Sequence, residues 1–390
     1  MQKGLQQWVI SMYFRLNPEC YYINGKSGGA IYDLIDEKIY RLNSQESELI
    51  EKCENNFEID GNNGLLLQLK RDCVGNFYDK DIFIQKLRVG SPIHDNQTDR
   101  PLLIAKAFLE INNQCDQSCW FCGYYGIHRS QGCMGCNKWN ESGECMEINK
   151  WKQIIDDLKD LDCQTLIFTG GDLSLIWEKT RELLEYAGNS FKNKFIILND
   201  KKISKEFLNE IKNIANPIIQ IDNIKKITRD TPYLLTLEAN RIDKIQIQNY
   251  NNIAIDLLSK DFSNIDPKSP LLSKPKIRNI NIFSFFYHGK MHPCLGNSIT
   301  ISWRGDILPC PIFREQRLGN IKENSLSQFF QNNGKDLEKF WKMHLGTIQK
   351  CGNCEFRYAC DDCRALEESL TGELYGKQLC GYDPSSGTWI

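Results

Sequence analysis

Short apolar runs alternate with longer amphipathic segments from residue 101 to about residue 290, and this alternation is the dominant pattern of the chain. The apolar runs predict buried strands at 102–111, 165–169, 195–198 and 218–221, with further strands at 234–237, 245–248 and 280–286. Apolar residues at helical spacing predict helices at 149–161, 175–186 and 203–215. Strands and helices in such alternation indicate the α/β class with a parallel sheet.

The first hundred residues have a mixed pattern that predicts a small, separate α+β domain. Residues 30–42 predict two strands around a turn at Asp36–Glu37. Asn43 followed by Glu46 has the spacing of a helix N-terminus, and a second helix is predicted at 64–73. We therefore divide the chain into three domains, at residues 1–100, 101–290 and 291–390.

Composition narrows the class of protein. The chain has 390 residues, a net charge of −2 and 25% charged residues, so no basic surface argues for nucleic acid. Apolar runs are too short to span a membrane, and no secretory signal is evident, so we expect a cytoplasmic protein. The 17 cysteines are mostly clustered, which in a reducing compartment favours metal binding over disulfides. Three isolated ones, Cys20, Cys53 and Cys73, are predicted to be small core residues.

Three cysteines lie close together directly after the predicted strand at 102–111. Cys115, Cys119 and Cys122 are four and three residues apart. A loop of this kind can wrap three thiolates around one face of an iron–sulfur cubane, which leaves the fourth iron open to a small chelating molecule. Zinc is the alternative metal, although structural zinc sites use four ligands.

With Phe121 just before the last cysteine, this motif resembles the cluster loop of radical S-adenosylmethionine (SAM) enzymes. The resemblance implies that the open iron binds the amino and carboxylate groups of SAM, and that Phe121 contacts this cofactor. One electron, from a flavodoxin or ferredoxin-type donor, then cleaves SAM to a 5′-deoxyadenosyl radical that abstracts a hydrogen atom. It also implies a partial, TIM-like (β/α)6 barrel with its active site at the carboxyl ends of the strands.

Further cofactor contacts are implied at the ends of later predicted strands. Gly170-Gly171-Asp172 stands where the family has Gly-Gly-Glu, whose backbone pairs with the SAM amino group. Asp172 is one methylene shorter than the usual glutamate, so its carboxylate reaches less far toward SAM. Asn199 and Asp222 follow two later strands and are candidates to hold the carboxylate or the ribose.

An insertion at 126–145 separates the loop from the first helix. It contains Cys133, Cys136 and Cys145, with His128 nearby. A C-x2-C pair with a further cysteine and a histidine could hold zinc or another cluster. The alternatives are free thiols, or a loop that opens to admit substrate.

The last hundred residues contain a second cysteine pattern, which includes C-x10-G-x4-C around Gly305. Its members are Cys294, Cys310, Cys351, Cys354, Cys360, Cys363 and Cys380. The order resembles the SPASM extension of peptide-modifying radical SAM enzymes, which binds two auxiliary [4Fe–4S] clusters. Asp361-Asp362 is one residue shorter than the family's spacing between Cys360 and Cys363. Two zinc ribbons are the rival interpretation.

By position in the SPASM pattern, Cys294, Cys310 and Cys363 would hold the first auxiliary cluster. The second would be held by Cys351, Cys354, Cys360 and Cys380. The first set lacks a fourth ligand, and relatives place one at the position of His288. Either His288 ligates, with His292 as a competitor, or the iron is open to a substrate thiolate; the turn-like sequence at 287–289 favours the open iron.

Together these resemblances imply a radical SAM/SPASM maturase with three [4Fe–4S] clusters that forms a thioether or carbon–carbon crosslink in a ribosomally made peptide. Residues 1–100 resemble a winged-helix-like, PqqD-like precursor-recognition domain, which would bind the leader of the precursor peptide as an added strand; a structural cap is the alternative. Two other functions stay open: oxidation of Ser or Cys to formylglycine, and a radical-SAM-like protein that has lost catalysis and presents peptide to a partner.

Overall fold

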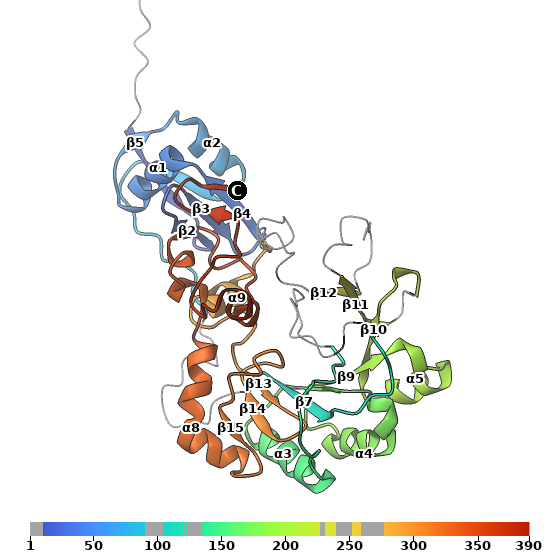
Figure 1. Ribbon diagram of the computed structural model, residues 1–390. Coiled ribbons are helices and arrows are strands. Elements are labelled where there is room, and N and C mark those ends of the chain that lie inside the picture. Colours follow the sequence, from blue (N-terminus) through green and yellow to red (C-terminus); the bar gives the residue numbers. More distant parts are fainter. Residues whose placement is uncertain are drawn as a thin grey trace, which may run out of the picture.

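A computed structural model describes residues 11–89, 104–120, 122, 135–226, 231–238, 252–258 and 277–389 (Figure 1). Its largest element is a nine-stranded sheet with the order β12-β11-β10-β9-β8-β7-β13-β14-β15. Strands β7 to β12 are parallel and adjacent in chain order. The predicted α/β class with a large parallel sheet is therefore confirmed.

The parallel strands and their helices fall close to the predicted positions. The strands are β7 (Lys106–Asn112), β8 (Thr165–Gly170), β9 (Asn193–Asn199), β10 (Asn216–Ile221), β11 (Tyr233–Glu238) and β12 (Ile253–Leu258). The helices between them are α3 (Ile148–Asp160), α4 (Trp177–Ala187) and α5 (Lys205–Lys212). The predicted strand at 245–248 lies outside the described residues, and β12 was not predicted.

The predicted strand at 280–286 is wrong, because this segment forms helix α7 (Ile282–His288). Asn281 caps the helix, and its side chain accepts a hydrogen bond from the backbone N–H of Ser284 at 2.9 Å. An apolar run of this length is ambiguous between strand and helix, and the polar cap decides between them.

The C-terminal domain extends the same sheet. Strand β13 (Ser298–Ile301) pairs in parallel with β7, and β14 (Asp306–Leu308) and β15 (Gly319–Asn320) follow as antiparallel neighbours. Helices α8 (Leu326–Trp341) and α9 (Arg364–Thr371), the short strands β16 (Tyr382–Asp383) and β17 (Thr388–Trp389), and loops complete the domain. The predicted boundary near residue 290 thus separates two regions that share one sheet.

The two faces of the parallel sheet differ in character. Helices α3, α4 and α5 lie along one side of it (Figure 1), where they form the main apolar core with α8. On the opposite face, apolar side chains come first along the strands and polar ones follow. These buried polar residues at the carboxyl ends, which we call the polar row, include Glu110, Thr169, Gln220, Thr236 and Asp256. Parallel sheets of this kind place their active sites at this edge.

The N-terminal domain contains two small antiparallel sheets and two helices. One sheet consists of β1 (Ser11–Leu16), β5 (Ile59–Asp60) and β6 (Gly75–Tyr78), and the other of β2 (Cys20–Asn24), β3 (Gly29–Asp33) and β4 (Lys38–Leu42). The helices are α1 (Ser44–Glu54) and α2 (Gly64–Arg71). The predicted β3–β4 turn and both helices are confirmed, including the capping box of Asn43 and Glu46. The winged-helix likeness stays a prediction.

The three isolated cysteines behave differently from one another. Cys20 and Cys53 are buried in the core of the N-terminal domain, as predicted. Cys73 is exposed and has a φ of +59°, so the prediction of a core residue is wrong there. It belongs to the turn that follows α2, where the chain reverses into β6.

Strand β3 joins the N-terminal domain to the C-terminal domain, because it is buried on both faces. Ile31 packs into the core beneath α1, whereas Ala30 and Tyr32 contact the cluster that contains Phe285. The Tyr32 hydroxyl donates to the backbone oxygen of Glu355 at 2.7 Å. The N-terminal strands accordingly lie beside the C-terminal end of the chain in Figure 1.

Arg314 links the sheet to the C-terminal domain through a buried ionic network. Its guanidinium donates to both carboxylate oxygens of Glu110 on β7 at 2.9 Å, and to Glu141 at 2.7 and 2.8 Å. It also lies 4.7 Å from the ring centre of Trp139, which donates from Nε1 to Glu110. Burial lowers the pKa of Arg314, but the two carboxylates raise it overall; burial in turn raises the pKa of Glu110, and the guanidinium of Arg314 opposes that rise.

Within the described residues, no helix has both the length and the apolar character needed to cross a lipid bilayer.

Replacing Arg314 with methionine should destabilise the protein strongly. The change leaves Glu110 buried without a counter-charge and Glu141 with Arg304 alone, 3.7 Å away, which costs on the order of 3–5 kcal/mol. Urea unfolding followed by tryptophan fluorescence measures the loss. The control is Lys339→Met, which breaks an exposed pair with Asp336 and should cost less than about 1 kcal/mol. Equal unfolding midpoints for the two variants would contradict the role given to the network.

Candidate functional site

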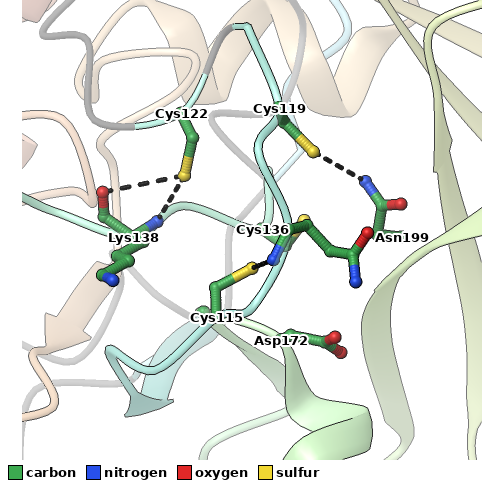
Figure 2. Close-up of a pocket in the computed structure, with 9 residues that line it drawn as sticks. Cys115, Cys119, Cys122, Cys136, Lys138, Asp172 and Asn199 are labelled. Carbon is green, nitrogen blue, oxygen red and sulfur yellow. Dashed lines mark hydrogen bonds between the residues drawn. The ribbon is translucent and has the colours of Figure 1, made fainter. Parts of the chain in front are cut away.

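The predicted cluster loop lies at the carboxyl edge of the parallel sheet, directly after β7. Its three cysteines surround a pocket that also receives residues from the ends of β8 and β9 (Figure 2). The pocket is lined by Cys115, Gln117, Cys119, Cys122, Cys136, Lys138, Gly171, Asp172 and Asn199. The structure therefore brings together the loop and three of the six predicted cofactor contacts, Gly171, Asp172 and Asn199.

Each loop sulfur has a hydrogen-bond donor beside it. The backbone N–H of Gln117 donates to the sulfur of Cys115 at 3.4 Å, and the backbone N–H of Lys138 donates to that of Cys122 at 3.1 Å. The sulfur of Cys119 accepts from Asn199 Nδ2 at 3.6 Å and from Lys201 Nζ at 3.5 Å. Burial raises the pKa of Cys115 and Cys122, and these backbone N–H groups lower it. Donors aimed at sulfur stabilise the thiolate form, which is the form that binds metal.

The glycines at the end of β8 have a definite steric role. Gly170 has a φ of +123°, and a Cβ atom on it would lie 2.3 Å from the backbone oxygen of Asn112. A Cβ on Gly171 would lie 2.2 Å from the backbone oxygen of Gln114. The N–H groups of Gly171 and Asp172 donate to these two oxygens at 3.0 and 2.8 Å. The glycines thus allow the segment that leads into Cys115 to lie against β8.

The remaining predicted contacts differ in position. Asp172 lines the pocket, and its Oδ1 also accepts from the backbone N–H and the hydroxyl of Ser174, so it caps the short 3-10 helix Leu173–Ile176. Asn199 lines the pocket as well. Asp222 is exposed after β10 and is not among the lining residues. Phe121 lies outside the described residues.

Cys136 and Lys138 line this pocket, although neither was assigned to it from the sequence. Cys136 belongs to the insertion, and its side chain lies in the pocket with the three loop cysteines (Figure 2). Its C-x2-C spacing with Cys133 was the available signal, but spacing alone does not give its position in the fold. Cys145 does not line the pocket, and Cys133 and His128 lie outside the described residues.

The donor set, three cysteines with hydrogen-bond donors to their sulfurs, has the chemistry that an iron–sulfur cluster requires. Among the residues whose structure is described, no three His, Cys, Asp or Glu side chains converge closely enough to hold a single ion. A [4Fe–4S] cluster binds each cysteine at a different iron, so its thiolates lie further apart than the ligands of one ion. Thiolates with N–H donors to their sulfurs are the surroundings that such clusters have.

Four C-terminal cysteines lie within electrostatic range of one another, and the backbone N–H of Cys354 donates to the backbone oxygen of Cys351 at 2.9 Å. Burial raises the pKa of Cys351 to about 12, with further contributions from Cys354 and Cys380. Cys360 in turn is influenced by Cys351 and Cys380. These are the four residues predicted to hold the second auxiliary cluster. Lys377 is buried beside them and forms an ion pair with Asp362.

Cys294 and Cys363 of the other predicted set are linked through a histidine. The backbone N–H of Cys294 donates to Nδ1 of His292 at 3.0 Å, and Nε2 of that ring lies 3.2 Å from Oδ2 of Asp362, the neighbour of Cys363. Both ring nitrogens of His292 are thus engaged with protein groups. His292 is therefore a poor competitor for the missing ligand position in this structure.

His288 differs from His292 in the hydrogen bonds that its ring makes. It is the last residue of α7, so the expectation of a turn at 287–289 is wrong. Its Nδ1 donates to the backbone oxygen of Tyr358 at 2.6 Å, which leaves the lone pair on Nε2. Burial lowers its pKa, which favours the neutral ring. A carbonyl partner on the other nitrogen is the usual arrangement of a metal-bound histidine.

Comparison with known proteins finds two matching family models. Residues 293–355 match the SPASM iron–sulfur cluster-binding domain, and residues 112–234 match a 4Fe–4S single cluster domain. No curated protein matches this chain. Cys360, Cys363 and Cys380 lie beyond the SPASM match.

Crystal structures of SuiB from Streptococcus suis are among the solved structures that match. SuiB bound to its precursor peptide SuiA has 14% identity and a TM-score of 0.46, over 94% of this chain and 100% of SuiB. SuiB bound to S-adenosylmethionine and SuiB without a named ligand each have 13% identity and a TM-score of 0.43, over 94% of this chain and 99% of SuiB.

Replacing Gly171 with alanine should reduce the iron content of the protein. The added methyl would collide with the Gln114 backbone and push the Cys115 segment away from β8, so up to about four iron atoms per chain would be lost. Iron analysis of the anaerobically purified protein measures the effect. Gly64→Ala is the matched control, because a Cβ there has no atom within 4 Å, and it should retain its iron. An undiminished iron content in Gly171→Ala would contradict the steric role.

Proposed function

We propose that this chain is a radical SAM enzyme that modifies a ribosomally made peptide. The observation that carries the proposal is the gathering of Cys115, Cys119 and Cys122 around one pocket at the carboxyl edge of a parallel sheet. The match of residues 112–234 to a 4Fe–4S cluster domain supports it independently. The sheet would then belong to the partial barrel of that family.

In this proposal the three loop cysteines hold a [4Fe–4S] cluster, and SAM binds between its open iron and the Gly170–Asp172 turn. The cluster supplies the electron that generates a 5′-deoxyadenosyl radical from SAM. The chain would position the cluster through N–H donors to the sulfurs, with Asn199 beside Cys119. It would position the substrate through the polar row at the strand ends. Asp172 contributes through the backbone of its turn, since its carboxylate caps a helix.

Two auxiliary clusters would complete the redox machinery, for a total of three. The grouping of Cys351, Cys354, Cys360 and Cys380 supports the second of them. For the first, the ring orientation of His288 favours this residue as the fourth ligand beside Cys294, Cys310 and Cys363. The clusters would accept the electron left on the substrate after crosslinking, and a flavodoxin or ferredoxin-type protein would supply the first electron.

The peptide substrate is proposed from the C-terminal domain, because the SPASM extension matched at 293–355 is typical of peptide-modifying enzymes. The N-terminal domain would bind the leader as an added strand. Its docking through Tyr32 on Glu355, next to Cys354, would hold the leader close to the second auxiliary cluster. The product would be a thioether or carbon–carbon crosslink.

Oxidation of a serine or cysteine to formylglycine is the second candidate. Those enzymes share the SPASM pattern, so the cysteines do not distinguish the two reactions. The observation that favours crosslinking is the integral N-terminal domain, which formylglycine formation does not require. A variant in which an exposed sheet edge of the N-terminal domain is altered would lose activity on a leader-bearing peptide if the enzyme forms crosslinks. It would keep its activity if the enzyme forms formylglycine.

Replacing Cys115, Cys119 and Cys122 together with alanine tests the central proposal. The variant should lose about four iron atoms per chain and all reductive SAM cleavage, while the iron of the auxiliary clusters remains. Iron analysis and detection of 5′-deoxyadenosine are the measurements. Cys20→Ala, in the core of the N-terminal domain, is the control and should retain both. An iron content equal to that of the wild type would refute the assignment.

Replacing His288 with alanine tests the first auxiliary cluster. If Nε2 of His288 binds iron, the electron paramagnetic resonance (EPR) spectrum of the reduced protein should change without peptide, because imidazole ligation raises the reduction potential of a cluster. His344→Ala is the control, since its Nδ1 accepts from the Gly346 N–H in a surface turn. An unchanged spectrum in His288→Ala, together with a response of the wild type to a peptide thiol, would favour an open iron instead.

A further inference from the structure

Residues 135–139 lie across the carboxyl edge of the sheet and are held there by hydrogen bonds to the ends of the strands and to the cluster loop. Thr169 donates to Gly135 O at 2.9 Å, Cys136 N to Gln220 Oε1 at 2.7 Å, Asn137 N to Gly170 O at 2.6 Å, and Trp139 N to Asn113 Oδ1 at 2.6 Å. Lys138 N donates to the sulfur of Cys122 at 3.1 Å. This strap, as we call residues 135–139, therefore touches both the sheet and the cluster loop.

The strap places a fourth thiol in the pocket of the cluster loop. Cys136 is 9% exposed and lines the pocket with the three loop cysteines (Figure 2). All three of those thiols lie within electrostatic range of it. Its backbone N–H is bonded to Gln220, so the residue has a defined position. Two separate segments thus contribute four cysteines to one pocket, which is the full ligand number of a [4Fe–4S] cluster.

We propose that Cys136 is the fourth ligand of the loop cluster until SAM replaces it. This inference rests on the proposed function, which provides the cluster and the cofactor. When Cys136 binds, its thiol releases a proton and a sulfur–iron bond forms; when SAM chelates that iron, the bond breaks and the sulfur takes up a proton. No electron is transferred in either direction, and the cluster keeps its oxidation state.

The strap also occupies part of the proposed SAM site. Asn137 N donates to Gly170 O, an acceptor in the turn where the SAM amino group would bind. SAM would therefore displace Cys136 at the iron, and at the Gly170 carbonyl it would share or replace the hydrogen bond from Asn137. A cluster with four thiolates has no open iron, so the strap protects the resting cluster from water and oxygen and makes SAM binding the step that opens it.

The alternative is that Cys136 is a small core residue. Its neighbours include Phe108, Ile167 and Ile197 on the same face of the sheet, which would suit such a role. The two interpretations differ in what the unique iron binds when SAM is absent. A core thiol would leave that iron with water or another small ligand, whereas a ligating thiol would leave no such position.

The first experiment compares reduced, SAM-free wild type with Cys136→Ser and Cys145→Ser. Cys145 lies in the same insertion but outside the pocket, so its variant is the matched control. The EPR difference spectrum between wild type and each variant cancels the auxiliary clusters. Cys136→Ser should show a changed loop-cluster signal and Cys145→Ser should show none. Identical SAM-free spectra in all three proteins would overturn the inference.

A measurement on the wild type alone covers the case in which Cys136→Ser does not assemble its cluster. Electron–nuclear double resonance in ¹⁷O-enriched water detects water bound to iron. The SAM-free wild type should show no ¹⁷O coupling at the loop cluster, because Cys136 fills the position. A ¹⁷O coupling there would overturn the inference.

SAM titration tests the displacement. Without a competing thiolate, Cys136→Ser should bind SAM more tightly, by about threefold or more, because no resting ligation must be broken first. Equal affinity in wild type and variant would refute displacement. If SAM changes the spectrum of neither protein, the proposed function fails, while the SAM-free comparison and the ¹⁷O measurement still decide the ligation of Cys136.

Discussion

The buried contact of Arg314 with Glu110 and Glu141 is the constraint on which the arrangement of the site depends. Glu110 belongs to β7, the strand that leads into the cluster loop, and Glu141 follows the strap. Arg314 comes from the C-terminal domain, four residues after Cys310. One guanidinium thus fixes the two cysteine-bearing segments of the pocket relative to the domain that carries the other cysteine set. A planar group with several donors in fixed directions suits this role better than a lysine would.

The polar row at the carboxyl edge of the sheet imposes a second requirement. Buried polar groups are costly unless they are hydrogen-bonded. Gln220 illustrates the solution: its Nε2 donates to Thr236, and its Oε1 accepts from the backbone of Cys136. Thr169 likewise donates to the backbone of Gly135. The strap and the polar row provide hydrogen-bond partners for each other. A ligand that displaces the strap must therefore offer hydrogen-bond partners to the polar row.

The sequence predicts the repetitive part of this fold well, because a buried parallel strand and an amphipathic helix each have a strong periodic pattern. It fails where the pattern is short or ambiguous: β1, β2, β5 and β6 were not predicted, and α7 was taken for a strand. For the site, spacing identified the three loop cysteines. It could not place Cys136, whose position depends on contacts with Gln220 and Gly170 far away in the chain. Gly170 and Gly171 were predicted to admit a ligand, yet their steric necessity comes from the backbone of Asn112 at the end of β7 and of Gln114 in the loop that follows it.

The contact between Tyr32 and Glu355 joins residues separated by 323 positions, which has a consequence for biosynthesis. On the ribosome the N-terminal domain emerges early, but one apolar face of β3 acquires its partners only when the last part of the chain has been made. Ala30 and Tyr32 are then exposed to solvent during most of translation. Since the partner region also carries cysteines of a proposed cluster, the packing of the earliest domain is completed only together with that of the latest one.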